Sequence, residues 1–187
     1  MPETNPTAAS EQRVRHVFDA LKLLRSVEEE LAQPLGKGDP VLTARQKELR
    51  GYIDVLMRQE LRRKPRFTVL DRKTDSGLSM AVEVAFRDAV QFYEGLRLSL
   101  SKAGIFIKTD NLLPIDTLLT MTCRLEAEGV SFTVAGKVIW INPRETQDRP
   151  QGMGVKLYKL SSIQRQILDD FMAGTVEASA LQHLGTS

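Results

Sequence analysis

The first third of the chain has the hydrophobic spacing of two amphipathic helices. Between Ser10 and Gln33 the apolar residues recur every three or four positions, as on one helical face, and Ser10 is a suitable N-cap. Residues 34–40 contain two prolines and two glycines, which interrupt this pattern. A second helix is predicted from Thr43, because Gln46 follows it at the spacing of a capping box.

The two predicted helices should fold back on each other as a helical hairpin, because the connection between them is short. Each apolar stripe is narrow, so the pair alone would leave apolar surface in contact with water. The hairpin therefore needs a third surface to pack against. That surface can come from the rest of this chain, from a second copy of the chain, or from a partner protein.

Beyond Pro65 the hydrophobic period changes from about 3.6 to 2, which indicates β-strands. The alternating runs, separated by turn residues, are Val82–Phe86, Leu96–Leu100, Leu119–Leu125, Phe132–Val134, Val138–Trp140 and Met153–Leu157. Short strands at this spacing predict a small antiparallel barrel or sandwich. Ser161 and Gln164 have capping-box spacing, and the helix that they predict would close an open end of the barrel. Cys123 lies on the apolar side of its run and is predicted to be a core residue.

The net charge of +2 is distributed unevenly along the chain. Residues 58–73 hold seven Lys or Arg and two Asp or Glu, so this segment carries +5 and the rest of the chain carries −3. A focused basic cluster indicates an anionic partner such as phosphate, nucleic acid or a lipid headgroup. The alternative is a solvated helix end, where cations complement the helix dipole. Phe67 is the one aromatic residue of the segment, so stacking residues are missing and nucleic acid is not the expected partner.

The chain lacks the sequence signatures of most enzymes and of membrane proteins. It has no HExxH or P-loop motif, and Gly77–Ala81 departs from GxSxG at its last residue. His16 and His183 lie near opposite ends of the chain, in segments predicted to be surface helices, where solvated side chains are the rule. A single cysteine excludes an internal disulfide and a multi-cysteine metal site. No run approaches the roughly 18 apolar residues of a membrane span, and the first ten residues do not resemble a signal peptide. We therefore expect a cytoplasmic protein that is not an enzyme and holds no metal or cofactor.

Two segments are candidates for binding a ligand. In the basic cluster, Pro65 disfavours helix at the preceding residue, so Arg62, Arg63 and Arg66 lie where a helix changes to extended chain. The planar guanidinium group donates two parallel hydrogen bonds to phosphate or to the edge of guanine.

The second candidate segment is the run Leu96–Leu100 with the residues that follow it. In a strand, Arg97, Ser99 and Ser101 share one face while the leucines share the other, and the row ends at a turn at Gly104. The alternative is an ordinary solvated strand face followed by a turn glycine.

Four further stretches follow one another along the chain: Phe92–Thr109, Leu113–Pro114, Gly136–Trp140 and Gly152–Val155. In this succession, residues 92–171 resemble a PilZ domain, close to the branch found in motility-associated bacterial proteins. This resemblance implies a six-stranded antiparallel β-barrel with a C-terminal helix, and the binding of the bacterial second messenger cyclic di-GMP. We therefore expect an α+β chain with an N-terminal helical hairpin (1–61), a basic linker (62–79), and a PilZ-like barrel with its C-terminal helix and tail (80–187).

Members of this family bind cyclic di-GMP through an RxxxR motif and a [D/N]xSxxG motif. Arg62 and Arg66 match the first motif, whereas in the second the serine and glycine are present but Ser99 replaces Asp or Asn. Losing that charge-assisted hydrogen bond costs about 1.5–3 kcal/mol. Thr68–Ser79 resembles an insertion that displaces the arginines from the barrel face. The ligand residues implied by the resemblance, with two neighbouring arginines, are Arg62, Arg63, Arg66, Arg97, Ser99, Ser101 and Gly104.

Two functions follow from the resemblance. In the first, cyclic di-GMP bridges the basic linker and the barrel face, orders residues 58–79, and changes the position of the hairpin, which a partner protein recognises. In the second, a degenerate PilZ module no longer binds the nucleotide and acts as a protein-interaction adaptor, with the hairpin as its docking or dimerisation surface. A binder of nucleic acid or of a membrane surface through the basic cluster is the third alternative.

Overall fold

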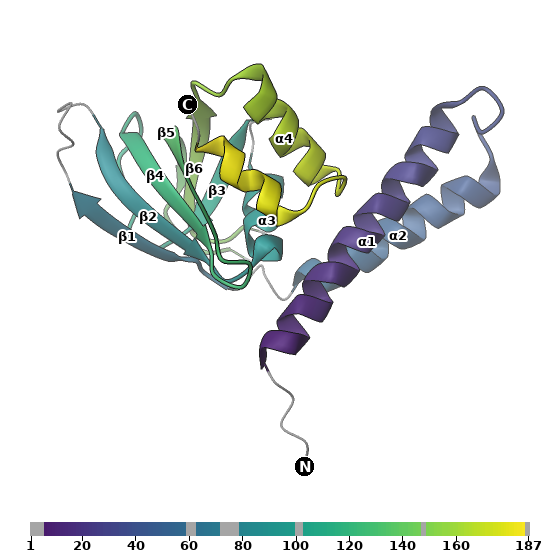
Figure 1. Ribbon diagram of the computed structural model, residues 1–187, viewed down its shortest axis with the longest axis horizontal. Helices are drawn as coiled ribbons and strands as arrows, with labels where there is room; N and C mark the ends of the chain where they lie inside the picture. The colour runs from purple at the N-terminus through teal and green to yellow at the C-terminus, as the bar shows by residue number, and fades with distance from the viewer. Residues whose placement is uncertain (1–5, 59–62, 72–78, 100–102, 147–148, 186–187) are drawn as a thin grey trace, which may run out of the picture.

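The computed structural model describes residues 6–58, 63–71, 79–99, 103–146 and 149–185. In chain order the elements are α1 (Pro6–Ala32), α2 (Pro40–Arg58), β1 (Arg66–Asp71), β2 (Met80–Phe86), α3 (Ala89–Arg97), β3 (Gly104–Lys108), β4 (Leu118–Leu125), β5 (Val130–Asn142), β6 (Gly152–Tyr158), α4 (Ser162–Met172) and the 3-10 helix η1 (Ala178–Leu184). The chain is therefore α+β, with two N-terminal helices followed by a curved sheet and further helices (Figure 1). None of the helices in these ranges combines the length and the apolarity needed to cross a membrane.

The six strands form one mixed sheet in the order β1-β2-β4-β5-β6-β3. Neighbouring strands pair antiparallel except β2 and β4, which run parallel. Strands β1 and β3 are the two edges, so the sheet is not closed. The expected six strands and their mostly antiparallel pairing are present, whereas the closed barrel is not. Residues 87–117 connect β2 to β4 and are long enough for the crossover that parallel strands require. An alternating pattern does not encode the direction of a strand, so the sequence did not reveal this crossover.

Strand β1 lies within the segment that we expected to be a basic linker and, in part, an insertion. It pairs antiparallel with β2 and places Arg66 opposite Ala85. Its Phe67 and Val69 are partly buried against the core, while Thr68 between them is exposed. This is the period of a strand at the edge of a sheet. The high density of basic residues around it hid that signal.

Strand β5 is continuous where two separate strands were predicted. A bulge between Val138 and Trp140 shifts its register against β6, which interrupts the alternation in the sequence. The glycines of β6 allow close packing beside this bulge. A Cβ on Gly152 would lie 2.3 Å from the carbonyl oxygen of Ile107 on β3, whereas one on Gly154 would lie 3.4 Å from the ring of Trp140.

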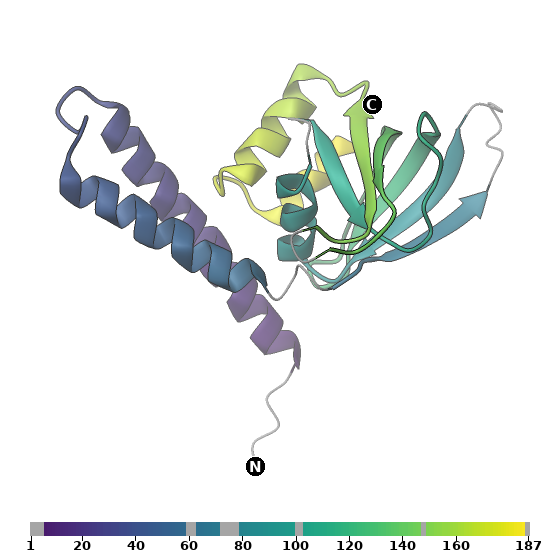
Figure 2. The ribbon, with the colours of Figure 1, turned by 180° about the vertical axis from the view of Figure 1, so that it is seen from behind.

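The hydrophobic core lies where α3 and α4 pack on the sheet, on the side that faces the hairpin (Figures 1 and 2). Phe92 of α3 is central to it, with ring centroids 5.2 Å from Phe86, 5.5 Å from Phe132 and 5.7 Å from Phe171. Tilted and edge-to-face aromatic pairs of this kind add stabilisation beyond their buried area. Cys123 is buried in the same core, as predicted, and burial raises the pKa of its thiol to about 12.

The predicted helix starts are confirmed for α4 and wrong for the first two helices. The Gln164 N–H donates to Ser161 Oγ at 3.2 Å, and the Ser161 N–H donates to Gln164 Oε1 at 2.8 Å, which completes the capping box of α4. By contrast, Ser10 lies inside α1, and α2 is capped by Asp39, whose carboxylate accepts from two backbone N–H groups of the first turn. Both helices begin at a proline, a residue that suits the first helical position, and so start before Ser10 and Thr43.

The hairpin packs against the rest of the chain through one part of its length. The hairpin residues buried in the shared core are Val17, Ala20, Leu21, Ile53 and Met57. Phe18 adds ring contacts to Tyr93 of α3 at 6.1 Å and to Phe171 of α4 at 5.1 Å. The remainder of the hairpin, including the loop between α1 and α2, projects away from the sheet (Figures 1 and 2). The rest of the chain therefore supplies the third surface for this part of the hairpin.

Candidate functional site

In the basic cluster, the residues just before β1 contact the start of α3 and the segment that follows β3. The Gln91 amide in the first turn of α3 donates to the carbonyl oxygen of Arg63 at 3.5 Å. The ammonium group of Lys64 lies 2.6 Å from a carboxylate oxygen of Asp110, which follows β3. Pro65 is buried between these two anchors and β1. The side chain of Arg63 is exposed, whereas Arg62 lies outside the described residues.

Arg66 begins β1 and makes an ion pair at the surface of the sheet. Its guanidinium Nη2 lies 2.6 Å from Oε1 of Glu126, in the turn between β4 and β5. The side chains of Arg66 and Glu126 are 66% and 50% exposed. An ion pair as exposed as this contributes about 0–1 kcal/mol. An anionic ligand could therefore displace Glu126 from Arg66 at little cost in free energy. In the free protein, however, the guanidinium group of Arg66 is already paired with Glu126.

The predicted strand at Leu96–Leu100 is wrong for residues 96–99, because residues 89–97 form the helix α3 and the next two are not in a strand; Leu100 lies outside the described residues. The carboxylate of Asp88 accepts from the Gln91 N–H at 2.9 Å and so caps the start of this helix. Arg97 lies in the last helical turn, and its guanidinium is 2.8 Å from Asp54 of α2. Arg97 therefore does not share a strand face with Ser99. Its side chain joins the domain to the hairpin.

The remaining predicted ligand residues follow α3. Ser99 comes directly after the helix, is partly buried, and donates its backbone N–H to the carbonyl of Leu96 at 3.2 Å. Gly104 is buried at the start of β3, opposite Lys156 of β6. Ser101 lies outside the described residues.

Helix α3 separates the two groups of predicted ligand residues. Arg63 is held at the first turn of the helix, and Ser99 follows its last turn. A helix of nine residues is about 13–14 Å long. The described parts of the RxxxR and [D/N]xSxxG remnants are therefore anchored at opposite ends of α3. The structure brings Arg63 close to Arg66 but does not bring either of them together with Arg97.

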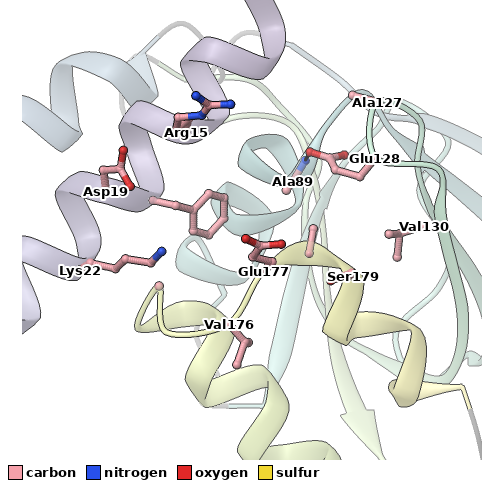
Figure 3. A pocket seen from close by; sticks show the side chains of 13 residues that line it. Arg15, Asp19, Lys22, Ala89, Ala127, Glu128, Val130, Val176, Glu177 and Ser179 are labelled. Atoms are coloured by element: carbon pink, nitrogen blue, oxygen red, sulfur yellow. Dashed lines mark hydrogen bonds between the residues drawn. The ribbon is translucent and has the colours of Figure 1, made fainter.

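A groove of about 670 Å³ lies where the hairpin meets the domain (Figure 3). Arg15 and Lys22 of α1 line one wall, Glu177 of the segment after α4 lines another, and Glu128 of the β4–β5 turn lies beside the start of α3. Basic and acidic groups are both present, so the groove has no preference for one sign of charge. Its walls come from segments far apart in the chain, which is why sequence patterns gave no sign of it.

Glu128 is a partly buried carboxylic acid of this groove with a raised pKa. Its Oε1 accepts from the Ala89 N–H at 2.9 Å, at the start of α3. Its Oε2 is buried and has no hydrogen-bond partner among the described residues. Burial raises the pKa of Glu128, and the nearby Asp88 raises it further, while the hydrogen bond from Ala89 lowers it. The net effect favours the protonated form of Glu128.

The described residues hold no group of three His, Cys, Asp or Glu side chains that could bind a metal ion. The thiol of Cys123 is fully buried, and a pKa of about 12 keeps it protonated at neutral pH. A thiol that is buried and protonated is a poor nucleophile.

A comparison with protein-family models matches residues 60–174 to the PilZ domain. The match covers more than half of the chain and includes β1, the part of the sheet that the sequence prediction assigned to a linker. The hairpin of α1 and α2 lies before the match, and η1 lies after it. No curated protein matches the chain.

Proposed function

The chain belongs to the PilZ domain family, whose members are typically non-enzymatic effectors in cyclic di-GMP signalling, and from that premise we propose that it is an adaptor that presents its helical hairpin to a protein partner. In this proposal the cyclic di-GMP site of the family is degenerate. The domain holds the hairpin in place, and the hairpin carries the interaction surface. A cytoplasmic location is expected from the lack of membrane-span and signal-peptide patterns, and a role in motility follows from the resemblance alone; both stay predictions.

The observation that best supports the adaptor is that two of the arginines predicted to bind the nucleotide form ion pairs within the chain. Arg66 is paired with Glu126, and Arg97 joins α3 to Asp54 of the hairpin. Ser99 lacks the carboxylate or amide of the family motif and follows the far end of α3 from Arg63. Binding in the family manner would therefore require both a broken ion pair and a rearranged chain.

A second candidate function is a cyclic di-GMP receptor, and the exposure of Arg63 and Arg66 favours it. Both side chains lie at the surface within a cluster of high positive charge. The pair between Arg66 and Glu126 is exposed enough for a phosphate group to replace the carboxylate. In this case the ligand would bind through the basic cluster and change the position of the hairpin.

Isothermal titration with cyclic di-GMP separates the two functions. The adaptor predicts no heat of binding up to about 100 µM, which corresponds to about −5.5 kcal/mol. The receptor predicts measurable heat that is lost in Arg66→Ala. Arg124→Ala is the matched control, because it also removes an arginine from an ion pair, with Glu83, but lies outside the basic cluster. Heat in the wild type that only Arg66→Ala abolishes would refute the adaptor.

Complementation in cells tests whether the function depends on the hairpin surface. In a strain that lacks the protein, Arg66→Ala should restore the wild-type phenotype, whereas a charge on the exposed hairpin surface, as in Tyr52→Glu, should not. The opposite result would place the function in the basic cluster. Hydrogen exchange on α1 and α2 with and without cyclic di-GMP would then show whether the nucleotide changes the hairpin.

A further inference from the structure

Helix α2 has two hydrophobic stripes, one buried in the shared core and one exposed to solvent. The first stripe includes Ile53 and Met57, which are buried in the shared core. The second contains Val41, Ala44, Gly51, Tyr52 and Val55, all exposed. Val41, Tyr52 and Val55 are 71%, 47% and 58% exposed, which is unusual for three large apolar side chains on one helix face. A Cβ on Gly51 would meet no atom within 4 Å.

The exposed stripe is directed away from both α1 and the domain. Gln46 and Arg50, on the opposite side of α2, contact Glu28 of α1. Successive residues of a helix are rotated by about 100°, so Tyr52 lies about 200° from Asp54, and Val55 lies about 200° from Met57. Asp54 contacts Arg97 of the domain, and Met57 is buried in the core. A partner that covers the stripe would therefore not collide with the domain that holds the hairpin.

We propose that this stripe binds the same stripe of a second copy of the chain, with the two α2 helices antiparallel and the two-fold axis beside Glu48. The axis places residues whose numbers add up to 96 opposite each other. Val41 then meets Val55 of the second copy, and Tyr52 meets Ala44. A large ring thus lies against a small side chain, which is the fit that closely packed helices require.

The charges on this face are also self-complementary. Arg45 and Glu48 are exposed near the centre of the stripe, and in the described part of the chain neither forms an ion pair. The antiparallel arrangement brings the two Glu48 carboxylates together at the axis and places Arg45 of each copy beside Glu48 of the other. A surface that matches itself in both size and charge is expected of an isologous dimer. An unrelated partner would not require this symmetry.

This inference names the partner in the proposed adaptor function and rests on that function only for its biological role. Analytical ultracentrifugation of the full chain, without nucleotide, tests it directly. We expect a species of twice the chain mass of 21.0 kDa and at least a tenfold loss of self-association in Val55→Glu. The matched control is Ile163→Glu, which places the same charge at an exposed isoleucine of α4. A monomer in the wild type at about 100 µM, where association weaker than about −5.5 kcal/mol escapes detection, would overturn the proposal. A monomeric wild type together with failed complementation by Tyr52→Glu would overturn the dimer and leave the adaptor intact.

Single cysteines test the position of the axis. Glu48→Cys should form a disulfide-linked dimer under mild oxidation, because the axis brings residue 48 of each copy together. Lys47→Cys is the control, since residue 47 is also exposed but points about 100° away. The native Cys123 is buried and should not contribute. Crosslinking of Lys47→Cys as fast as Glu48→Cys would refute the antiparallel arrangement.

A charge exchange distinguishes self-association from any other occupant. Arg45→Glu and Glu48→Arg should each weaken the dimer several-fold, because each places like charges across the axis. The double variant should recover wild-type association, because both cross-axis pairs are restored with opposite polarity. Failure of the double variant to recover would show that the two residues do not face each other.

Discussion

Replacing Phe18 with alanine should weaken the attachment of the hairpin to the domain. The ring of Phe18 is partly buried and contacts Tyr93 and Phe171, with centroids 6.1 Å and 5.1 Å away. A fully buried Phe→Ala change costs about 3–5 kcal/mol, so about 2 kcal/mol is expected for this half-buried ring. At about 2–4 °C per kcal/mol for a chain of this size, the melting temperature should fall by about 4–8 °C.

Thermal unfolding followed by circular dichroism measures this change, and hydrogen exchange shows where it acts. In Phe18→Ala, the backbone amides of α1 should exchange faster than in the wild type, while those of β4 and β5 should change less. Leu23→Ala is the matched control, because Leu23 lies on the same helix and is 48% exposed. Its effect should stay within about 0.5 kcal/mol. Equal effects of the two substitutions would refute the docking of the hairpin through Phe18.

Three further predictions concern the sheet and the groove. In a urea titration, Gly152→Ala should destabilise the fold by several kcal/mol, because its Cβ would lie 2.3 Å from the backbone oxygen of Ile107. Gly154→Ala is the control and should be tolerated, so equal unfolding midpoints for the two variants would refute this prediction. Glu128→Gln should unfold at the same temperature as the wild type below about pH 4.5 and at a higher one at neutral pH. The reason is that a raised pKa in the folded state removes stability as pH rises through it, and an unchanged difference across pH would contradict the assignment. Cys123 should react with a thiol reagent at pH 8 only after unfolding, because its pKa is about 12; rapid labelling of the native protein would show that the core is open.

The sequence predicted the hairpin, most of the strands and the C-terminal helix, because each carries a local period. It failed at α3, where Leu96, Leu98 and Leu100 alternate like a strand. The helical signal there was Asp88 followed by Gln91, the spacing of an N-cap and its third residue. That capped start, with the burial of Phe92 in the core, overrides the alternation.

The candidate site was less predictable than the fold, because its ion pairs join distant residues. Arg97 pairs with Asp54, 43 positions earlier, and Arg66 pairs with Glu126, 60 positions later. No periodic pattern links residues at such separations. The basic cluster could be recognised from the sequence, whereas the carboxylates that neutralise part of it could not.

Because the hairpin contacts the rest of the chain near the middle of α1, a small rotation at this contact moves the loop between α1 and α2 through a larger distance. Phe18 lies near the middle of a helix of 27 residues, and the loop that joins α1 to α2 lies beyond the other end of that arm. About 15 residues of helix separate the two, which at 1.5 Å per residue is about 22 Å. A rotation of the hairpin by about 10° about Phe18 would therefore move the loop between α1 and α2 by about 4 Å, by the same helix geometry. A displacement of that size is large enough to make or break side-chain contacts of the loop, although the contacts of Phe18 would hardly change.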